Sequence, residues 1–272
     1  MSLKEFSLTV DGLRAQCWEG GSGTPLLLLH GSGPGAASQG TWRLVLEPLM
    51  ARYRVLATDL IGFGMSDRKA EGPFFDIDLW MKQAHALLDY AGGEKAYVIG
   101  HSLSGYLAMR LASEDSRVAK LVTTGTMGAN FACNAETEKC WTFPQTREQL
   151  RSTLESLMFD RSGITDELLD YRMGILHDGK YGPYFSSMFA GDKQRCIKAA
   201  SLSPEQLQRI RCPVLMIHGR EDIMFPAEGT TMEISKHLPQ ADILLLSQCR
   251  HLPAAEHPGK VAAAVTDFFG PV

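Results

Sequence analysis

Six short runs dominated by apolar residues recur along the chain and restrict the folds that it can adopt. They lie at 25–29, 54–58, 96–99, 120–123, 214–217 and 242–246. Runs this short and continuous are typical of strands that are covered on both faces, as in parallel sheets. Helical patterns separate most of them, such as the segment that carries Leu79, Leu87 and Leu88. The alternation predicts an α/β fold, with a mostly parallel twisted sheet and helices on both faces.

The start of the chain has a different pattern. Apolar and polar residues alternate up to Val10, a turn follows at Asp11 and Gly12, and a second stretch runs over 13–18. Alternation around such a turn is the signature of a hairpin. We therefore predict that two antiparallel strands begin the sheet.

Between residues 130 and 204 the alternation of strands and helices stops. A capping box begins at Thr146, and Thr165 is a second helix N-cap, yet no buried-strand run occurs there. Helical insertions of this length commonly form lids over active sites. We therefore predict a core domain of residues 1–129 and 205–272 and a helical lid of residues 130–204.

Composition narrows the choice of partners. The net charge is −4, so no basic surface indicates nucleic acid, and no apolar stretch approaches the roughly 18 residues of a membrane span. The six cysteines include no C-x-x-C pair, which favours free thiols and gives no metal site. Residues 1–5 lack the apolar core of a secretory signal. We expect a cytoplasmic protein with a small-molecule substrate and no cofactor, and a homo-oligomer is compatible with this sequence.

A candidate nucleophile follows the run at 96–99. The segment G-H-S-L-S-G of residues 100–105 stands between this run and a helical pattern, so that Ser102 occupies a strand-to-helix turn. A nucleophile elbow needs small residues around such a turn, usually as G-x-S-x-G. Here Ser104 replaces the last glycine. On the motif alone, Ser102 could equally be an ordinary N-cap of a buried helix.

A serine nucleophile needs a base, and the base needs an acid that fixes its tautomer. Asp222 follows the run at 214–217, and His251 follows the last run, so the three residues occur in the order Ser, Asp, His that accompanies a nucleophile elbow of this kind. Glu221 is the alternative acid and His257 the alternative base. We favour Asp222 for its place in the G-x-x-D loop of residues 219–222, and His251 because His257 stands before Pro258 at the expected start of the terminal helix.

The oxyanion of a tetrahedral intermediate needs preorganised donors. The backbone N–H of Leu103, the residue after the nucleophile, is one candidate. The other lies in the glycine-rich loop that starts at residue 30, where we favour the N–H of Ser32 and keep Gly31 as its competitor. No G-x-G-x-x-G followed by a helix and a ribose-binding acid is present, which excludes a dinucleotide site.

Together, these motifs resemble the α/β-hydrolase superfamily along nearly the whole chain. The segment H-G-S-G-P-G-A at residues 30–36, Trp42 with Arg43, and the lid sequence around 146–172 resemble the meta-cleavage product hydrolases of bacterial aromatic degradation. Those enzymes split a carbon–carbon bond in vinylogous 1,5-diketones. The resemblance implies that Arg172 binds the carboxylate of a dienoate, a role suited to a guanidinium group. A surface charge on the lid is the alternative interpretation of Arg172.

The resemblance also implies that Gly31, Thr41 and His101 contact the substrate. His101 and Thr41 stand where those enzymes commonly have asparagine, Arg250 where glycine precedes the histidine, and Leu252 where tryptophan often follows it. The leading hypothesis is therefore a cofactor-free serine hydrolase that cleaves a carbon–carbon bond in a ring-fission product. A carboxylesterase or lactonase acting on a small apolar ester is the second hypothesis, and a ligand-sensing protein with this fold is the third.

Overall fold

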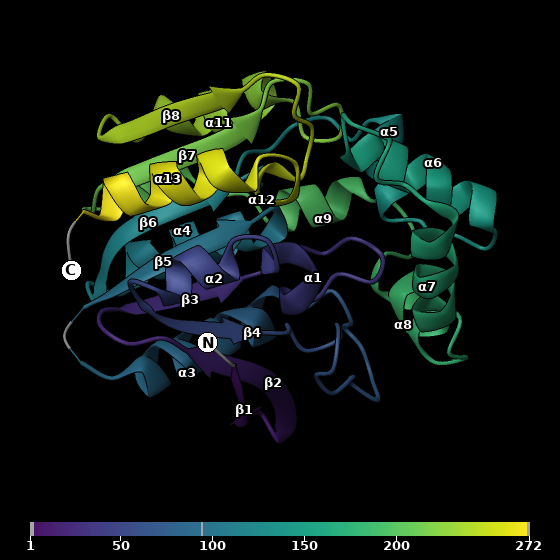
Figure 1. Ribbon diagram of the computed structural model, residues 1–272, viewed down its shortest axis with the longest axis horizontal. Helices are drawn as coiled ribbons and strands as arrows, with labels where there is room; N and C mark the ends of the chain where they lie inside the picture. The colour runs from purple at the N-terminus through teal and green to yellow at the C-terminus, as the bar shows by residue number, and fades with distance from the viewer. Residues whose placement is uncertain (1–2, 94, 271–272) are drawn as a thin grey trace.

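Eight strands form one twisted sheet in the part of the chain that the computed structural model describes, residues 3–93 and 95–270. Their spatial order is β1-β2-β4-β3-β5-β6-β7-β8 (Figure 1). The bounds are β1 Lys4–Val10, β2 Leu13–Gly20, β3 Pro25–Leu29, β4 Arg54–Thr58, β5 Ala96–His101, β6 Val118–Thr124, β7 Val214–Gly219 and β8 Ala241–Leu246. β2 pairs antiparallel with β1 and β4, and the other pairs are parallel. The predicted fold class and opening hairpin are confirmed. The prediction that residues 1–5 do not form a secretory signal falls partly on residues 1 and 2, which lie outside the described part.

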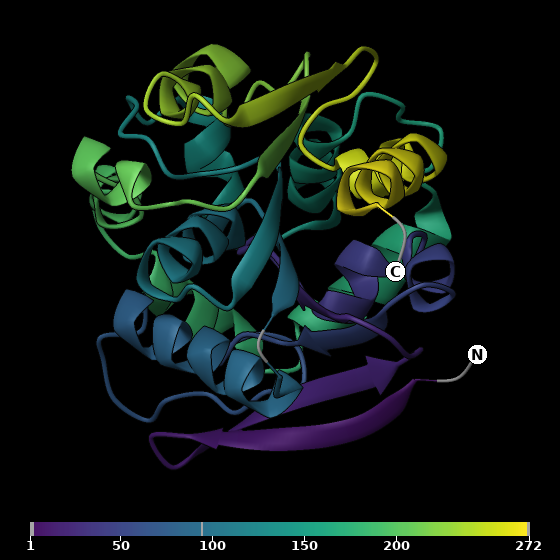
Figure 2. The ribbon, with the colours of Figure 1, turned by 90° about the vertical axis from the view of Figure 1, so that its left-hand side faces the viewer.

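Helices cover both faces of this sheet. One face is covered by α3 (Ile77–Ala91) and α4 (Leu103–Glu114), and the other by α2 (Leu46–Met50) and α13 (Pro258–Phe269), as Figure 2 shows. Shorter elements complete the layers: α1 Ser38–Trp42, α10 Pro204–Gln208, η1 Ala227–Gly229, α11 Thr231–Ser235 and α12 Pro253–Glu256. No described helix is both long enough and apolar enough to cross a bilayer.

The strand β3 shows why the runs are continuously apolar. Leu27 and Leu29 belong to the hydrophobic cluster beneath α3 and α4, whereas Leu26 and Leu28 belong to the cluster beneath α2 and α13. Successive side chains of a strand point to opposite faces, so a strand covered on both sides has no position for a polar residue. All four leucines are fully buried, at about 1.5–3 kcal/mol each.

Between β6 and β7 lie α10, which packs on α4, and five helices that extend beyond the carboxyl ends of the parallel strands (Figure 1). They are α5 Ala135–Cys140, α6 Arg147–Leu157, α7 Asp166–Leu176, α8 Tyr181–Met188 and α9 Gln194–Ala199. Thr146 forms the predicted capping box with Gln149, and Thr165 caps α7 by accepting from the N–H of Leu168. Both predicted helix starts are thus confirmed, and helices cover the edge of the sheet where loops after parallel strands converge.

Candidate active site

Ser102 lies in a sharp turn between β5 and α4. Its backbone has φ 56° and ψ −121°, a conformation that is strained for a residue with a side chain, at about 1–3 kcal/mol. The turn depends on two glycines. A Cβ on Gly100 would lie 2.1 Å from the carbonyl oxygen of Ser104, and one on Gly105 would lie 2.0 Å from Oγ1 of Thr126. The helix therefore starts close enough to the sheet to hold the Ser102 hydroxyl above the strand ends.

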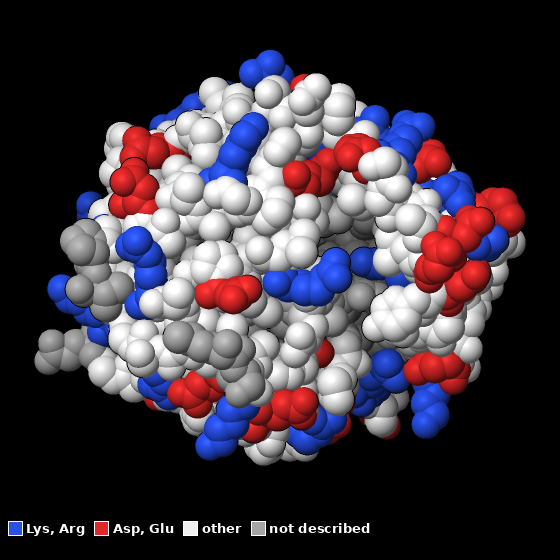
Figure 3. All heavy atoms as spheres, in the orientation of Figure 1, with Lys and Arg blue, Asp and Glu red and all other residues white. Residues whose placement is uncertain are grey.

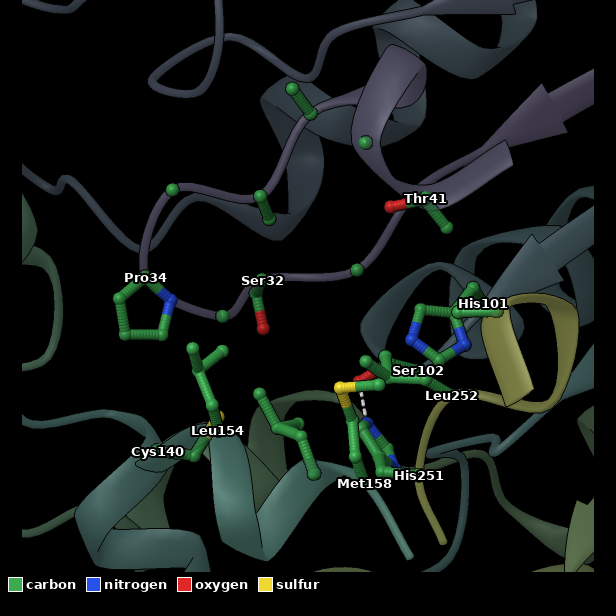
Figure 4. A pocket seen from close by; sticks show the side chains of 18 of the residues that line it. Ser32, Pro34, Thr41, His101, Ser102, Cys140, Leu154, Met158, His251 and Leu252 are labelled. Atoms are coloured by element: carbon green, nitrogen blue, oxygen red, sulfur yellow. Dashed lines mark hydrogen bonds between the residues drawn. The ribbon is translucent and has the colours of Figure 1, made fainter. Parts of the chain in front are cut away.

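The structure brings the three predicted catalytic side chains together. Oγ of Ser102 lies 3.0 Å from Nε2 of His251, and Nδ1 of His251 lies 2.7 Å from Oδ2 of Asp222. All three residues are buried, and Figure 4 shows the contact between Ser102 and His251 at the pocket. The side chains follow the carboxyl ends of β5, β7 and β8, which lie at the same edge of the sheet with β6 between β5 and β7. An imidazole thus bridges a hydroxyl and a carboxylate.

Asp222 is held by several donors. Its Oδ1 accepts from the backbone N–H groups of Met224 and Phe225, each at 3.0 Å, and its Oδ2 lies 3.2 Å from Nε2 of His218. Burial by itself raises the pKa of Asp222, but the neighbouring His251 and the hydrogen bonds from His218 and His251 outweigh it and hold this pKa below the usual range. Sequence reasoning missed His218, whose only signal is its place at the end of β7.

Glu221 and His257, the alternative acid and the alternative base, make other contacts. Oε2 of Glu221 accepts from the N–H of Cys249 at 3.1 Å, which ties the loop after β7 to the loop after β8. Nε2 of His257 lies 3.1 Å from the carbonyl oxygen of Ser247 and 3.0 Å from that of Gln248. Neither Glu221 nor His257 is part of the chain of hydrogen bonds that ends at Ser102.

The loop after β3 is oriented by His30. The Leu60 N–H donates to Nε2 of His30 at 2.9 Å, so the proton of this imidazole is on Nδ1, which donates to the Gly31 carbonyl at 2.6 Å. In a planar trans peptide the carbonyl and the following N–H point in opposite directions, so the Ser32 N–H is directed away from the His30 ring. Gly31 itself lies against the nucleophile, since a Cβ there would be 2.9 Å from Cβ of Ser102. Leu103, at the first position of α4, has a backbone N–H without an intrahelical acceptor.

Ser104 connects this loop to the helix after the nucleophile. Its hydroxyl donates to the His30 carbonyl, and both groups are buried. This contact explains why serine is accommodated where the usual motif has glycine.

We expect the substitution Ser104→Ala to lower the free energy of unfolding by about 1–3 kcal/mol, because it leaves the buried His30 carbonyl without its donor. Denaturant titration measures this loss. Ser113→Ala is the matched control on the same helix, since the half-buried Ser113 hydroxyl bonds only the Arg110 carbonyl one turn earlier. Equal losses in the two variants would contradict the assignment.

A pocket opens above Ser102 between the core and the helices α6 and α7. Figure 3 shows a hollow on this face of the molecule with basic side chains at its edge. The wall that the helical segment contributes is mainly apolar, and the pocket lining as a whole has more apolar than polar groups. The lining includes Gly31, Ser32, Thr41, His101, Leu154, Leu157, Met158, Leu168, Arg172 and Leu252 (Figure 4). In the described ranges, no group of three or more His, Cys, Asp or Glu side chains is placed to hold a metal ion.

Arg172 reaches this pocket from α7. Burial and the nearby Arg43 lower the pKa of its guanidinium, although Tyr181 and Tyr171 oppose the shift. Among the described residues, no carboxylate is paired with it. A cation that is partly removed from water and faces a pocket without a counter-ion is a suitable partner for an anionic ligand group.

The loop that carries His251 is bonded to the end of α6. The His251 N–H donates to the Leu157 carbonyl at 3.0 Å, and the guanidinium of Arg250 donates to the Glu155 carbonyl. The carboxylate of Glu256 accepts from the Arg250 N–H at 2.8 Å. These contacts account for the arginine that replaces the usual glycine before the histidine, since a cation near the last carbonyls of a helix is favourable.

Comparison with known proteins places this arrangement in a family. Residues 24–258 match the family model described as the alpha/beta hydrolase fold. The chain belongs to the α/β-hydrolase fold family. This hydrolase is 31% identical over 258 residues to the 2-hydroxymuconate semialdehyde hydrolase of Pseudomonas sp. (strain CF600). The alignment covers 94% of this chain and 90% of that relative.

Solved structures agree with the sequence relatives. A variant of the meta-cleavage product hydrolase from Pseudomonas fluorescens IP01, complexed with acetates, is 31% identical and superposes with a TM-score of 0.92 over 97% of each chain. The 2-hydroxy-6-oxo-6-phenylhexa-2,4-dienoate hydrolase from Rhodococcus sp. strain RHA1 is 25% identical, with a TM-score of 0.91 over 98% of this chain and 99% of that one. The resemblance to meta-cleavage product hydrolases that the sequence motifs indicate is therefore confirmed.

Proposed function

We propose that this hydrolase cleaves a carbon–carbon bond in a 2-hydroxy-6-oxo-dienoate, a ring-fission product of aromatic degradation. The observation that carries the proposal is the hydrogen-bonded chain from Ser102 through His251 to Asp222 at the base of a pocket that also exposes Arg172. Two relatives about 30% identical over nearly the whole chain are named as hydrolases of 2-hydroxymuconate semialdehyde and of 2-hydroxy-6-oxo-2,4-heptadienoate. The substrate is a small molecule, and none of the proposed steps needs a cofactor.

In the proposed reaction, Ser102 attacks the 6-oxo carbonyl while Nε2 of His251 accepts the hydroxyl proton. Asp222 keeps the other imidazole proton on Nδ1 and stabilises the imidazolium ion that forms. The N–H groups of Ser32 and Leu103 donate to the oxyanion, a contribution of about 3–4 kcal/mol for one such donor in other hydrolases. Water then releases the acyl group from Ser102.

Cleavage of a carbon–carbon bond requires a stable carbon leaving group. Ketonisation of the dienol precedes cleavage: C5 gains a proton and the 2-hydroxyl group releases one to water, so that the electron pair of the broken bond is delocalised onto the resulting 2-oxo group. His251 is the proposed acid for this protonation, because its Nε2 faces the pocket at Ser102 (Figure 4). Helices α5–α9 serve as the proposed lid of residues 130–204, which excludes bulk water from this step. The cytoplasmic location and the homo-oligomer stay predictions.

Arg172 is the proposed carboxylate-binding residue, and Gly31 and Thr41 contact the substrate beside it. We expect Arg172→Met to raise KM for a dienoate about 10- to 100-fold, since a charge-assisted hydrogen bond contributes about 1.5–3 kcal/mol. Steady-state kinetics on the dienoate measures this change. An uncharged aryl ester is the control substrate, and its KM should change less than about threefold. An unchanged KM for the dienoate would instead support the alternative interpretation of Arg172 as a surface charge.

A substrate panel tests the proposed function directly. The parent enzyme is assayed with 2-hydroxymuconate semialdehyde, 2-hydroxy-6-oxo-2,4-heptadienoate and short aryl esters, with loss of the dienoate absorbance as the readout. Prompt bleaching of the dienoates supports carbon–carbon hydrolysis. Ester turnover without bleaching would instead identify a carboxylesterase, and tight retention of a ligand without turnover would identify a binding protein.

A further inference from the structure

The glycine-rich loop that carries the Ser32 N–H, the proposed oxyanion donor, is bonded to the core at its two ends. At the start of the loop, the Ser104 hydroxyl donates to the His30 carbonyl, and at the far end Ser38 is hydrogen-bonded to the core. The residues between these ends line the pocket (Figure 4). Within the described part of the chain, no core residue outside the loop is hydrogen-bonded to its middle, residues 32–35.

The helices of the proposed lid hold the middle of the loop instead. The hydroxyl of Tyr181, at the first position of α8, accepts from the Gly35 N–H at 2.9 Å. The indole N–H of Trp141 donates to Oγ of Ser32 at 3.2 Å. Gly35 has φ 69°, and a Cβ there would lie 3.4 Å from Cδ2 of Leu176. Gly35 is therefore the point at which the loop contacts both α7 and α8.

Tyr181 is itself fixed in place. Its backbone N–H donates to Oδ1 of Asp178 at 2.6 Å, at the start of α8. The guanidinium of Arg68 lies over its ring, with Cζ 5.5 Å from the ring centroid, and also lies 3.9 Å from Oδ2 of Asp178. The ring of Phe185, one turn later in α8, packs beside it, and Tyr181 is buried. Because the Tyr181 side chain has little freedom to move, its hydroxyl sets the position of the loop at Gly35.

We propose that Tyr181 is a positioning residue, which holds the loop after β3 so that the Ser32 N–H faces the oxyanion. The inference rests on the serine attack of the proposed function, but it does not depend on which bond is cleaved. An oxyanion donor contributes fully only when it is held in advance at about 3 Å from the oxygen. Release of the loop at Gly35, three residues after Ser32, leaves this donor present but less well placed. The rate should then fall, whereas binding of the uncharged ground state should not.

Steady-state kinetics of Tyr181→Phe tests the proposal, because this substitution keeps the ring beneath Arg68 and removes the acceptor of the Gly35 N–H. Loss of a whole oxyanion donor costs about 10²–10³ in kcat, so we expect displacement of one to lower kcat about 10-fold. The loss should be similar for dienoates and aryl esters, and KM should stay within about threefold, as for an interaction made only in the transition state. Tyr184→Phe on the same helix is the matched control and should keep the parental kcat, since the Tyr184 ring packs on Phe74.

A pair of ketones separates this role from a general loss of structure. Benzyl trifluoromethyl ketone binds by addition: Oγ of Ser102 bonds the carbonyl carbon, the hydroxyl proton moves to Nε2 of His251, and the carbonyl oxygen becomes an oxyanion. Benzyl methyl ketone has a similar shape, but its carbonyl is not activated for this addition. We expect Tyr181→Phe to weaken inhibition by the trifluoromethyl ketone about 10-fold and to change the affinity for the methyl ketone less than about threefold.

Hydrogen exchange at the Gly35 amide reports on the contact in the parent, without a variant. We expect this N–H to be protected in the parent and to exchange at least about 10-fold faster in Tyr181→Phe, because its acceptor is then lost. NMR of the full chain measures the exchange. If the phenylalanine variant does not fold, the protection of Gly35 in the parent decides the question.

Three results would each overturn the role of Tyr181. They are an unprotected Gly35 amide in the parent, parental kcat or parental inhibition by the trifluoromethyl ketone in Tyr181→Phe, and an equal loss in Tyr184→Phe. Dienoate bleaching by the parent would leave the proposed function intact in each case. A parent that hydrolyses only esters would correct the proposed function and leave this inference in place, whereas equal affinities of the parent for the two ketones would remove the serine attack on which both rest.

Discussion

Ser102→Ala is expected to lower turnover about 10⁶-fold, the scale found for triad members of other hydrolases that act as one unit. The variant keeps the pocket, the oxyanion donors and Arg172, yet it has no oxygen 3.0 Å from Nε2 of His251 to attack the carbonyl. The loss should appear in kcat for dienoates and aryl esters alike, because both reactions begin with the same attack. Dienoate bleaching and ester release, each followed at saturating substrate, measure it.

The fold of the Ser102→Ala variant should be retained. Alanine, like serine, has a Cβ, so the strained φ of 56° costs a similar amount in both proteins. Thermal unfolding within a few degrees of the parent therefore serves as the control. Turnover close to the parental rate on every accepted substrate would exclude Ser102 as the nucleophile, whichever bond the enzyme breaks.

Asp222→Asn is expected to lower turnover about 10⁴-fold, as the equivalent change does in a serine protease. The backbone N–H groups of Met224 and Phe225 already occupy Oδ1, so the remaining position facing His251 would hold the amide nitrogen. His251 would then accept at Nδ1 and carry its proton on Nε2, where it cannot receive the proton of Ser102. Kinetics on the same substrates measures the loss, and Glu221→Gln, at a residue that bonds Cys249, is the matched control.

The pH dependence of stability gives an independent readout for Asp222. The fold lowers the pKa of this carboxyl below its value in the unfolded chain, near 3.9, despite the opposing effect of burial. The ionised form therefore stabilises the fold above that pH, and this contribution is lost as the pH falls through the folded pKa. The unfolding free energy of the parent should approach that of Asp222→Asn as the solution is acidified below about pH 4. A difference independent of pH would contradict the lowered pKa.

Fold class and chain order were accessible from the sequence because both depend on local patterns. The leucines of β3 alternate between two hydrophobic clusters, and only a strand covered on both faces needs such a run. The places of Ser102, Asp222 and His251 directly after strands made their convergence predictable, since parallel strands bring their carboxyl ends to one edge of the sheet.

Residues whose contacts form only in the folded structure could not be predicted from the sequence. His218 contacts Asp222 and His30 bonds the Leu60 N–H, but a histidine near a strand end has no pattern that reveals its hydrogen bonds. Apolar residues of the helical segment were equally ambiguous. Trp141, Met158 and Phe185 all pack in one hydrophobic cluster, but of these three only Trp141 and Met158 also line the pocket, and hydrophobicity is required in both cases.

The bond between the His251 N–H and the Leu157 carbonyl has a consequence for how this scaffold can diversify. The last turn of α6 is a wall of the cavity and also supports the loop that carries His251, so we expect a deletion or a register shift there to alter reactivity together with selectivity. Residues on α7 have no such bond to the loop after β8. Laboratory evolution toward bulkier substrates should therefore accumulate changes along α7 and leave the backbone of the final turn of α6 intact.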